Sequence, residues 1–510
     1  PAPSGSLDLV FTSSTWNIAQ TVTVTGQDDD IADGDQAVII ALGASSTDTV
    51  YNAIDPADPT VTNIDDDAVG ITVTPLSGLT TSESLGSDTF TIVLESEPNG
   101  YVELSVASDN TDEGDVDISV PAFTGANWDL AQTITVTGID DALYDGDVSY
   151  NVVVSVNIGN TLDTTGYTGV SAVNVEVTNA NDDFLTEVYV DGASGNDGNP
   201  GSDTLPKQTL QAGIVAAVAA GVSEVRVAQG TYVVSSPVDL ADGIVLKGGY
   251  SSSSWATRDP DVYTTTVSDS NTTGGTITTP LSAIQAVAGT TSTIDGFTIN
   301  GALNGDYTAG VRAESSTLTI TSSTISGGGG TTQSDAVSYR HSTDGVSNTL
   351  TVQGSTLNVG SGGSSAHGIN VYHGYGASNP LLQVTISNNV ITDSGTSTPS
   401  ATAIELDNGN PTQTLLTSEV SYNHINITNS SSVANGIDIT GKALVFNNIV
   451  IVGTAAGPLG QGIMISSNVA SAGDYTEILS NTVIANGDSG SGALLISPAN
   501  PIIEHNALVA

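Results

Sequence analysis

The repeat that decides the fold begins at Gly310-Val311-Arg312-Ala313 and returns toward the end of the chain. Each copy places a small residue before an apolar, a polar and a second apolar residue. Successive copies start 26 to 35 residues apart, as from 310 to 336 and from 368 to 403. Strands this short cannot each bury an apolar face alone, so we expect them to stack coil upon coil. The later copies are Ala336-Val337-Ser338-Tyr339, Gly368-Ile369-Asn370-Val371, Ala403-Ile404-Glu405-Leu406, Gly436-Ile437-Asp438-Ile439 and Gly462-Ile463-Met464-Ile465.

A second strand in each repeat is marked by an Asn followed by alternating apolar residues. An Asn at the same corner of every coil is typical of a stacked ladder of side-chain amides, which satisfies the polar groups of the turns. We therefore predict a right-handed parallel β-helix with irregular loops on one side. The Asn-marked strands are Asn388-Asn389-Val390-Ile391, Asn423-His424-Ile425, Asn447-Asn448-Ile449, Asn481-Thr482-Val483-Ile484 and Asn506-Ala507-Leu508.

Composition agrees with an all-β chain that has several domains or a solenoid. The 510 residues are too many for one compact core, and only 12% are charged while 38% are hydrophobic. The 56 glycines indicate many turns, whereas the periodic Val and Ile argue against a disordered acidic tail. The absence of cysteine excludes disulfides.

The ends of the sequence suggest a segment of a longer protein. It begins at Pro1 without a signal peptide and stops inside a coil signature at Asn506-Ala507-Leu508. No apolar run reaches the length of a membrane span. We expect an exported protein whose export signal lies outside this segment.

The net charge of −48 is unevenly distributed. Residues 1–183 hold 31 acids and no Lys or Arg, while residues 184–510 hold 24 acids and 7 bases, so −31 and −17 add to −48. Such self-repulsion opposes compaction unless cations neutralise it, and it excludes nucleic acid and anionic membranes as natural partners. Evenly spread acids would indicate adaptation to high salt. Here the acids cluster, which favours calcium sites.

A longer repeat explains the clustering. The run from Trp16 to Asp29 returns from Trp128 to Asp141, 112 residues later, and Phe11 and Phe123 obey the same offset. A unit of this length with alternating strands predicts a β-sandwich. We expect a partial module at 1–67 and a complete one at 68–183, with Ile134 and Val136 facing inward. Further echoes are Asp33-Gly34-Asp35 with Asp145-Gly146-Asp147, and Val61-Thr62-Asn63-Ile64-Asp65-Asp66-Asp67 with Val177-Thr178-Asn179-Ala180-Asn181-Asp182-Asp183.

These motifs resemble the Calx-β family of Ig-like calcium-binding modules. The resemblance rests on Thr81-Ser82-Glu83, Asp88-Thr89-Phe90, the Phe123 to Trp128 segment, the Gln-Thr-Ile-Thr-Val-Thr-Gly strand and the terminal acidic runs. It implies Ca²⁺ ligands near the module start, after the long strand and at the module end. The second module ends Asn-Asp-Asp, which implies weaker binding or fewer ions than in the first. The implied ligands are Glu83, Asp140, Asp141, Asp182 and Asp183 in the second module, and Asp28, Asp29, Asp30, Asp65, Asp66 and Asp67 in the first.

A physical argument supports the same ligands. Calcium takes roughly six to eight oxygen ligands, and adjacent carboxylates repel one another unless a cation bridges them. The alternative is that each run is a solvated turn, because Asp is a common turn residue. Recurrence of both runs in a region without basic residues favours calcium.

From Val188 the pattern changes to that of a capped coil stack. The Ala-rich run 208–220 predicts the one helix of the chain, with apolar Leu210, Ile214, Val215 and Val218. Strands follow at Val225-Arg226-Val227-Ala228 and Gly243-Ile244-Val245-Leu246. This opening resembles the pectate-lyase-like β-helix superfamily, in which a short helix plugs the open end of the stack. A plug covers unpaired strand groups and apolar interior.

The polar positions of the coils form a candidate ligand face. If the first apolar residue of each copy points inward, the next residue and the third after it point outward. A sugar acid would need such a face, with Arg for its carboxylate, Tyr for stacking and a carboxylate pair for acid–base chemistry. The catalytic candidates are Arg312, Arg340, Glu405, Asp407 and Asp438, and the ligand-binding candidates are Tyr372 and His373.

The alternative for this face is simple charge balance between adjacent coils. No motif fixes a lyase or hydrolase mechanism, and no zinc, nucleotide or Ser-His-Asp signature is visible. The other histidines, His341, His367, His424 and His505, fall at strand ends, where we expect them to cap turns.

Two functions remain open. The first is an extracellular or cell-surface structural or adhesive segment, which could self-associate into a filament or surface layer and meet a glycan or another surface ligand. The second is a secreted polysaccharide lyase or glycoside hydrolase, or a glycan-binding protein. Tandem modules, scarce bases and the missing catalytic motif favour the structural role over an enzyme.

Overall fold

A computed structural model describes residues 7–118, 120–141, 143–342, 347–361, 363–374, 382–393, 400–408, 416–453, 459–466, 476–487, 491–497 and 502–510. The chain divides into two compact units, Pro1–Asp183 and Phe184–Ala510. Strand counts below refer to the described residues. No helix within these ranges is long and apolar enough to cross a membrane.

Residues 68–183 form a sandwich of two sheets, as the alternating strands predict. In chain order, β4 and β11 are the first and last strands of the second of these sheets, and they run parallel and pair directly. One sheet has the order β3 (Ile71–Thr74), β5 (Ser87–Leu94), β9 (Gln132–Gly138), β7 (Gly114–Val116). The other has the order β4 (Leu79–Ser82), β11 (Val173–Ala180), β10 (Val148–Val156), β6 (Val102–Ser108), β8 (Ala122–Phe123).

The sandwich core comes from the inward residues of both sheets. Ile134 and Val136 on β9 are fully buried, which confirms that these side chains face inward as expected. Phe90, Phe123 and the 3₁₀ residue Tyr167 fill the space between the sheets. Burying such aromatic side chains gives a small domain much of its stability.

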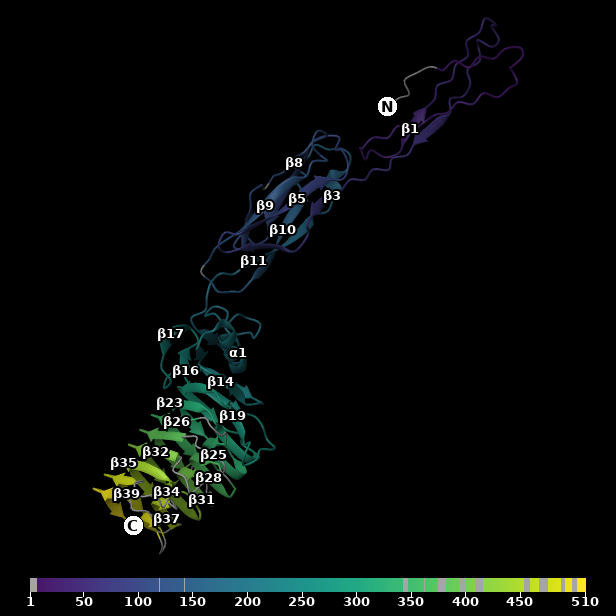
Figure 1. Cartoon of the computed structure of the whole chain (residues 1–510). Coiled ribbons are helices and arrows are strands. Elements are labelled where there is room, and N and C mark those ends of the chain that lie inside the picture. Colours follow the sequence, from purple (N-terminus) through teal and green to yellow (C-terminus); the bar gives the residue numbers. More distant parts are fainter. Residues whose placement is uncertain are drawn as a thin grey trace. The chain divides into compact units, whose positions relative to one another are not determined.

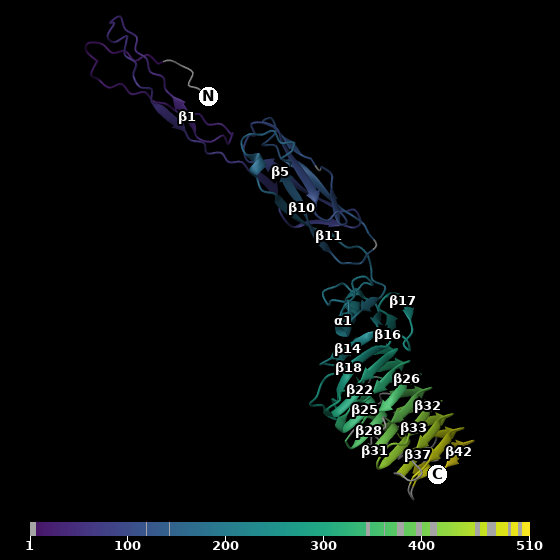
Figure 2. The ribbon, with the colours of Figure 1, turned by 180° about the vertical axis from the view of Figure 1, so that it is seen from behind.

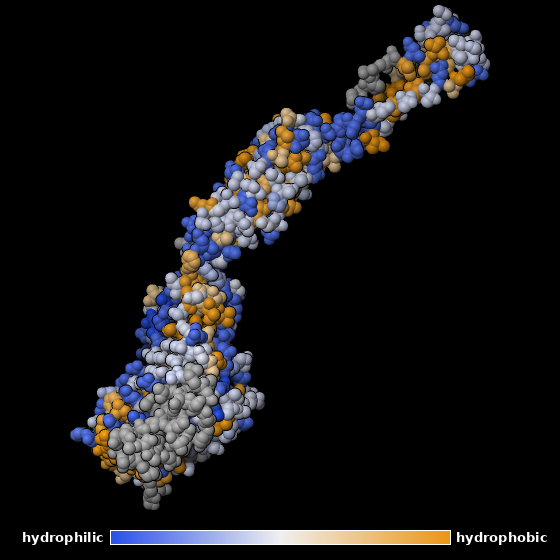
Figure 3. All heavy atoms as spheres, viewed as in Figure 1, coloured by the Kyte–Doolittle hydropathy of each residue, from blue (hydrophilic) through white to orange (hydrophobic). Residues whose placement is uncertain are grey.

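Residues 7–67 contain a two-stranded sheet of β1 (Gln36–Ile39) and β2 (Thr60–Asn63). Many of their apolar side chains are exposed, including Phe11 and Trp16, and Figure 3 shows hydrophobic surface along this part of the chain. The motif is the same as in the sandwich, but these residues bury no comparable core.

Phe184–Ala510 is a parallel β-helix, which confirms the expected all-β fold. Figures 1 and 2 show its strands stacked in rungs from α1 to the C-terminus. The first of its three sheets runs β12 (Val188–Val190), β13 (Glu224–Ala228), β16 (Val245–Ser251), β20 (Thr291–Asp295), β23 (Thr317–Thr321), β26 (Asn348–Gln353), β29 (Leu382–Ser387), β32 (Leu416–Ser421), β35 (Lys442–Phe446), β38 (Glu477–Leu479), β41 (Ile502–Glu504), with β17 (Ser254–Arg258) beside β16.

In the first sheet β17 pairs β16 antiparallel, whereas the strands of the other two sheets are parallel throughout. The second runs β14 (Gly230–Val234), β18 (Thr265–Asp269), β21 (Phe297–Asn300), β24 (Thr324–Ser326), β27 (Thr356–Val359), β30 (Val390–Asp393), β33 (His424–Ile427), β36 (Ile449–Val452), β39 (Thr482–Ala485), β42 (Ala507–Val509). The third runs β15 (Val238–Leu240), β19 (Leu281–Ala286), β22 (Gly305–Glu314), β25 (Gly330–His341), β28 (Ser365–His373), β31 (Ser400–Asn408), β34 (Val433–Thr440), β37 (Leu459–Ser466), β40 (Gly492–Ser497).

The predicted ladder of Asn side chains lies at the corner between the first and second sheets. Each amide nitrogen donates to the amide oxygen of the Asn one coil further on, at 2.9 to 3.0 Å. The residue before each Asn has a positive φ of 55° to 59°, so the chain turns sharply there. The ladder satisfies buried polar groups that the turn would otherwise leave unpaired. Its members are Asn389, Asn423, Asn448, Asn481 and Asn506.

The predicted cap helix is α1 (Leu210–Ala220). Thr209 caps its N-terminus by accepting a hydrogen bond from Ala212 N, and Gly221 ends it in the left-handed conformation. Leu210 and Ile214 are buried against the end of the stack, whereas Val215 and Val218 are exposed.

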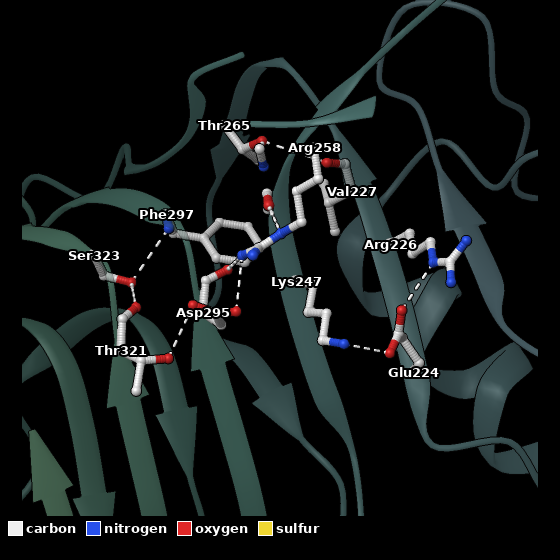
Figure 4. Close-up of polar contacts among 12 residues, drawn as sticks. Glu224, Arg226, Val227, Lys247, Arg258, Thr265, Asp295, Phe297, Thr321 and Ser323 are labelled. Carbon is white, nitrogen blue, oxygen red and sulfur yellow. Dashed lines mark hydrogen bonds and ion pairs between the residues drawn. The ribbon is translucent and has the colours of Figure 1, made fainter. Parts of the chain in front are cut away.

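Basic residues form ion pairs with acidic residues of the first coils (Figure 4). Glu224 on β13 pairs with both Arg226 and Lys247, and Arg258 on β17 pairs with Asp295 on β20 at 2.8 Å. Arg258 also donates to the Gly248 carbonyl. Three of the few bases of the chain are thus committed to structure at this end of the β-helix.

Candidate functional site

One candidate site is the acidic end of the sandwich. Glu83 follows β4 and is almost completely buried, with its carboxylate accepting a hydrogen bond from Asp182 N at 3.0 Å. One carboxylate oxygen of Asp183 is also buried and has no hydrogen-bond partner among the described residues. The structure therefore brings the module start and the module end together, as the calcium prediction requires.

The carboxylates at this end raise one another's pKa. Burial raises the pKa of Glu83, and the charges of Asp141, Asp145 and Asp183 add to the rise. Burial and the neighbouring charges of Asp182, Asp141 and Asp140 likewise raise the pKa of Asp183. Since residues 1–183 contain no Lys or Arg, no basic side chain of this unit offsets the repulsion, and a bound cation would do so.

Glu113, which the sequence did not single out, lies beneath these carboxylates. Glu113 is buried and accepts a hydrogen bond from the Asn179 amide at 3.2 Å. Its pKa is raised by burial and also by the negative charges of Asp145 and Asp141. Nothing in the run Asp112-Glu113-Gly114 distinguished it from a surface turn.

The first module repeats the hydrogen bonds of this acidic end. Asp65 N donates to the Asp35 carboxylate at 3.1 Å, and its counterpart Asn181 N donates to the Asp147 carboxylate at 3.2 Å. Burial raises the pKa of Asp67, and the negative charges of Asp65 and Asp66 raise it further. The predicted ligands Asp28, Asp29, Asp65, Asp66 and Asp67 line one hollow of about 700 Å³.

Within the described parts of the chain, no three Asp, Glu or His side chains are already arranged as a metal site. Asp30 does not line that hollow, although its charge also raises the pKa of Asp67, and Asp140 lies close enough to Asp183 to raise the pKa of that carboxyl. Asp30 contacts Glu97 N only through its carbonyl oxygen, at 2.7 Å.

The second candidate site is the outward face of the third sheet of the β-helix. Its register sets the predicted residues in two adjacent rows, as the repeat indicated. One row is Arg312, Ser338, Asn370, Glu405, Asp438 and Met464, and the other begins Glu314, Arg340, Tyr372, Asp407 and Thr440. Partners in a row belong to neighbouring strands, which lie about 4.8 Å apart.

His367 is the centre of this face. Its Nδ1 lies 2.7 Å from Asp335 Oδ1 and its Nε2 lies 2.8 Å from Glu405 Oε2, so one buried ring joins β25, β28 and β31. Although burial opposes a charged ring, Asp335 and Glu405 raise the pKa of His367 to about 10. Gln333 and Asn370 also donate to Asp335, which fixes that carboxylate.

The three carboxylates of this face differ in their surroundings. The hydrogen bond from His367 lowers the pKa of Glu405. Burial and, to a smaller extent, the negative charges of Glu405 and Asp407 raise the pKa of Asp438 to about 6. Burial and the charge of Glu405 raise the pKa of Asp407. In the described part of the chain, Asp438 has no hydrogen bond or ion pair. Carboxyl groups whose pKa values are driven apart are characteristic of acid–base sites.

The two arginines of the face behave differently. Arg312 is committed to Glu314 at 2.6 Å and to Gln285 at 3.0 Å. Arg340 lies over the ring of Tyr372, 4.7 Å from its centroid, and forms no ion pair with any described residue. Arg340 is therefore the arginine of this face whose charge is still available to a ligand.

His373 does not lie on the outward face, where the sequence placed it at the edge. It is fully buried, and its ring stacks against His341 with centroids 5.0 Å apart. His341 is buried as well and bonds Asn348, and burial with His373 lowers its pKa to about 4. Of the four histidines expected at strand ends, His424 begins β33, His505 occupies a positive-φ corner, and His341 ends β25 and bonds Asn348 at the start of β26. His367 lies within β28 and caps no turn.

The sequence carried a signal for His367 and Asp335 that the repeat analysis did not use. Both stand two residues before the first inward apolar residue of their copy, in Asp335-Ala336-Val337 and His367-Gly368-Ile369. Thr402 and Asn435 continue that row on β31 and β34. Extending each copy by one position would have shown this row, although alternation from Val337 and Ile369 would have pointed its side chains inward.

Comparisons with known proteins identify no family. No family model matches the chain, and no curated protein matches it. Solved structures include a C. elegans MSP family member, WR4 (14% identity, TM-score 0.16, 22% of this chain and 96% of the other). Others are domains 4 and 5 of the S-layer protein SbsC (18%, 0.16, 26% and 61%) and CBD12 from CALX1.2 (15%, 0.17, 24% and 49%). Similarities this weak carry no argument about function.

Proposed function

We propose that this chain is a structural segment of an extracellular or cell-surface protein, with Calx-β-like sandwich modules stiffened by calcium and followed by a pectate-lyase-like β-helix. The observation that carries the proposal is the buried carboxylate oxygen of Asp183, which has no hydrogen-bond partner in the described part of the chain. It lies among like charges in a unit that has no basic residue to compensate them.

The side chains present are of the type that binds calcium. Carboxylate oxygens are the ligands that calcium prefers, and the proposed holders are Glu83, Asp140, Asp141, Asp182 and Asp183. In the first module they are Asp28, Asp29, Asp30, Asp65, Asp66 and Asp67. Bound calcium supplies positive charge. The chain's own contribution is to hold Glu83 near the terminal residues 181–183, so that neutralising them orders the end of the module. Modules stiffened in this way suit a filament or surface layer.

Thermal unfolding of the whole chain tests this proposal, at fixed ionic strength, with calcium, with magnesium and with a chelator. We expect chelation to lower the transition of residues 1–183 and leave that of the β-helix unchanged, because a ligand stabilises the state that binds it. Particle size measured in parallel reports self-association. A sandwich transition that responds to sodium as well as to calcium would leave the acids as an adaptation to salt.

Two variants locate the ion. Glu83→Gln keeps the shape of the side chain but removes the buried charge, so it should weaken the response to calcium. Asp129→Asn is the matched control, since Asp129 is an exposed acid of the same module away from its acidic end. An equal calcium response in both variants would remove Glu83 from the site.

A second candidate function is glycan binding or cleavage on the β-helix, favoured by the His367 pair with Glu405 and the unpartnered Asp438. The pairing keeps Glu405 ionised, while Asp438 retains its proton to higher pH, which suits one base or nucleophile and one acid. Arg340 and Tyr372 beside them offer a charge and a ring for recognition.

Binding and turnover on a panel of neutral, acidic and amino polysaccharides test this candidate. Asp438→Asn and Glu405→Gln should abolish turnover, or weaken binding if there is none. Asp239→Asn is the control, because Asp239 is an exposed carboxylate on β15, five strands from β31 in the same sheet. A response of the control equal to that of the other two variants would exclude this face as the site.

A further inference from the structure

A buried polar network joins the first and last strands of the second sheet of the sandwich. Thr81 on β4 donates a hydrogen bond from its hydroxyl to Asn179 Oδ1 on β11, at 2.9 Å. The amide nitrogen of Asn179 donates to Glu113 and to the Ile139 carbonyl, both at 3.2 Å. All three side chains, Thr81, Asn179 and Glu113, are buried.

The network has the components of an acyl-transfer reaction. Thr81 carries a hydroxyl nucleophile, Asn179 carries an amide carbonyl, and Glu113 contacts the nitrogen that would leave. The carbonyl carbon of Asn179 is one bond of about 1.2 Å beyond Oδ1. It therefore lies within about 4.1 Å of Thr81 Oγ1, close to the separation of about 3–3.5 Å at which positioned groups react.

Two glycines and a tyrosine pack closely around the buried polar network. A Cβ on Gly138 would meet Asn179 Oδ1 at 2.4 Å, so only glycine lets β9 approach the amide this closely. The hydroxyl of Tyr150 lies 3.5 Å from Thr81 Oγ1, and Gly114 packs on the Tyr150 ring. Water, which would compete as a nucleophile, has little room among these groups.

We propose that Thr81 and Asn179 form an intramolecular ester cross-link between β4 and β11, assisted by Glu113. Thr81 Oγ1 adds to Asn179 Cγ and forms the new C–O bond. The Cγ–Nδ2 bond then breaks with its electron pair on nitrogen. Glu113 gives that nitrogen a proton and regains one from the Thr81 oxygen. The chain loses one ammonia, nothing is oxidised or reduced, and Glu113 ends in the state in which it began.

The position of the bond has a mechanical consequence. β4 and β11 run parallel, with Thr81 directly opposite Asn179 in the register. Tension between the start and the end of the module pulls two parallel strands past each other in shear. A covalent bond across this pair carries that load independently of the hydrogen bonds. This inference is independent of calcium and adds to the structural role a bond that does not need the ion.

The first module contains an internal comparison. Asn63 corresponds to Asn179, and its amide donates to the Gln27 carbonyl at 2.8 Å, as Asn179 donates to the equivalent Ile139 carbonyl. Among the described residues, no hydroxyl or carboxylate bonds Asn63. The same amide is thus present twice, once with the reacting partners and once without them.

Intact mass measurement of the purified, denatured chain tests the cross-link. We expect a mass below that of the sequence by one ammonia per chain, not two. Residues 1–183 contain no Lys or Arg, so digestion uses a protease that cuts at acidic residues. The digest should yield one branched peptide holding Thr81 and Asn179, which hydroxylamine separates. A wild-type chain of full mass overturns the proposal without reference to any variant.

Variants assign the atoms. Thr81→Val removes the hydroxyl and should restore the full mass, while Thr81→Ser retains the loss of ammonia. Thr80→Val, which changes the exposed neighbour, is the matched control and should also retain the loss. Glu113→Gln should slow the loss measured over time after synthesis. Loss of ammonia that persists in Thr81→Val would place the reaction elsewhere, for example at a succinimide, and would overturn the assignment.

Discussion

The acidic end of the sandwich and the outward face of the β-helix both gather carboxylates, but they compensate the charge differently. On the β-helix, His367 lies between Asp335 and Glu405 within hydrogen-bond distance of both, and its single positive charge offsets one of their two negative charges. At the sandwich end, the charges that act on Glu83 and Asp183 all come from further acids, and the unit holds no Lys or Arg. Clusters of similar composition therefore impose different requirements on their surroundings.

The difference shows what each cluster can do. A carboxylate pair bridged by a buried histidine has an internal counter-charge without any ligand, and beside it Asp407 and Asp438 have raised pKa values, that of Asp438 at about 6. A cluster without a counter-charge raises the free energy of the folded unit until a cation binds. The first arrangement suits recognition or chemistry at a fixed face, and the second suits a structural ion.

The largest effect should come from removing the internal counter-charge of the β-helix. His367→Gln leaves Asp335 buried without its ionic partner, and breaking a buried pair costs about 3–5 kcal/mol of unfolding free energy. Gln333 and Asn370 still bond Asp335, so we expect the lower end, about 3 kcal/mol, by denaturant unfolding. His424→Gln, at an exposed position, is the control and should change the free energy by less than about 0.5 kcal/mol. Equal values for the two would mean that the ion pair contributes no stability.

Calcium should give the next largest effect, and only on residues 1–183. At free calcium a hundredfold above its Kd, one site stabilises the folded unit by about 2.7 kcal/mol. Calorimetry over a calcium series measures the shift of each transition. A parallel shift of the β-helix transition would contradict the difference between the two clusters.

The free energy of unfolding of the β-helix should depend on pH through two histidines, with opposite signs. The pKa of His341 is lowered to about 4, below its unfolded value, so its contribution is present above about pH 6.5 and is lost as pH falls toward 4, by at most about 3 kcal/mol. The pKa of His367 is raised to about 10, so its contribution is present below about pH 6.5 and is lost as pH rises through 10. Unfolding of His341→Asn and His367→Gln across this range separates the two. An acid limb unchanged in His341→Asn would assign that limb to other groups.

The smallest effect should come from the unpartnered carboxylate. Asp438→Asn removes a charge that Glu405 and Asp407 oppose, so at pH 7 we expect stabilisation of about 1 kcal/mol, allowing for its partial exposure. The gain should vanish below about pH 4, where the native carboxyl is already protonated. Denaturant unfolding at both pH values measures it. A loss of stability at pH 7 would show that Asp438 has a favourable partner.

The sequence predicted most of the β-helix because its information is periodic. The alternation around Val311, Val337 and Ile369 assigns each residue to a face, and the recurring Asn assigns a corner. Stacking then aligns equivalent positions, so the row that contains Arg312, Glu405 and Asp438 could be derived before the structure. The helix predicted at 208–220 followed from its Ala-rich composition and apolar residues, and it forms at Leu210–Ala220.

Contacts between rows were not predictable, since strand alternation gives direction but not distance. His367 belonged to a row that the repeat analysis did not include, and only the register brought it between Asp335 and Glu405. His373, two positions after an inward Val371, is an inward residue by the same alternation, and its burial against His341 removed it from the outward face.

Phe11 and Phe123 show where the sequence stops being informative. They occupy equivalent positions in two copies of one motif, yet Phe11 is 54% exposed and Phe123 is 0% exposed. The sequence determined the strand pattern, the acidic turns and the absence of basic partners. Tertiary structure decided which copy has a facing sheet to bury its apolar side chains, and which polar groups meet, as Thr81 meets Asn179. Burial and close approach depend on segments distant in the chain, and local sequence does not encode them.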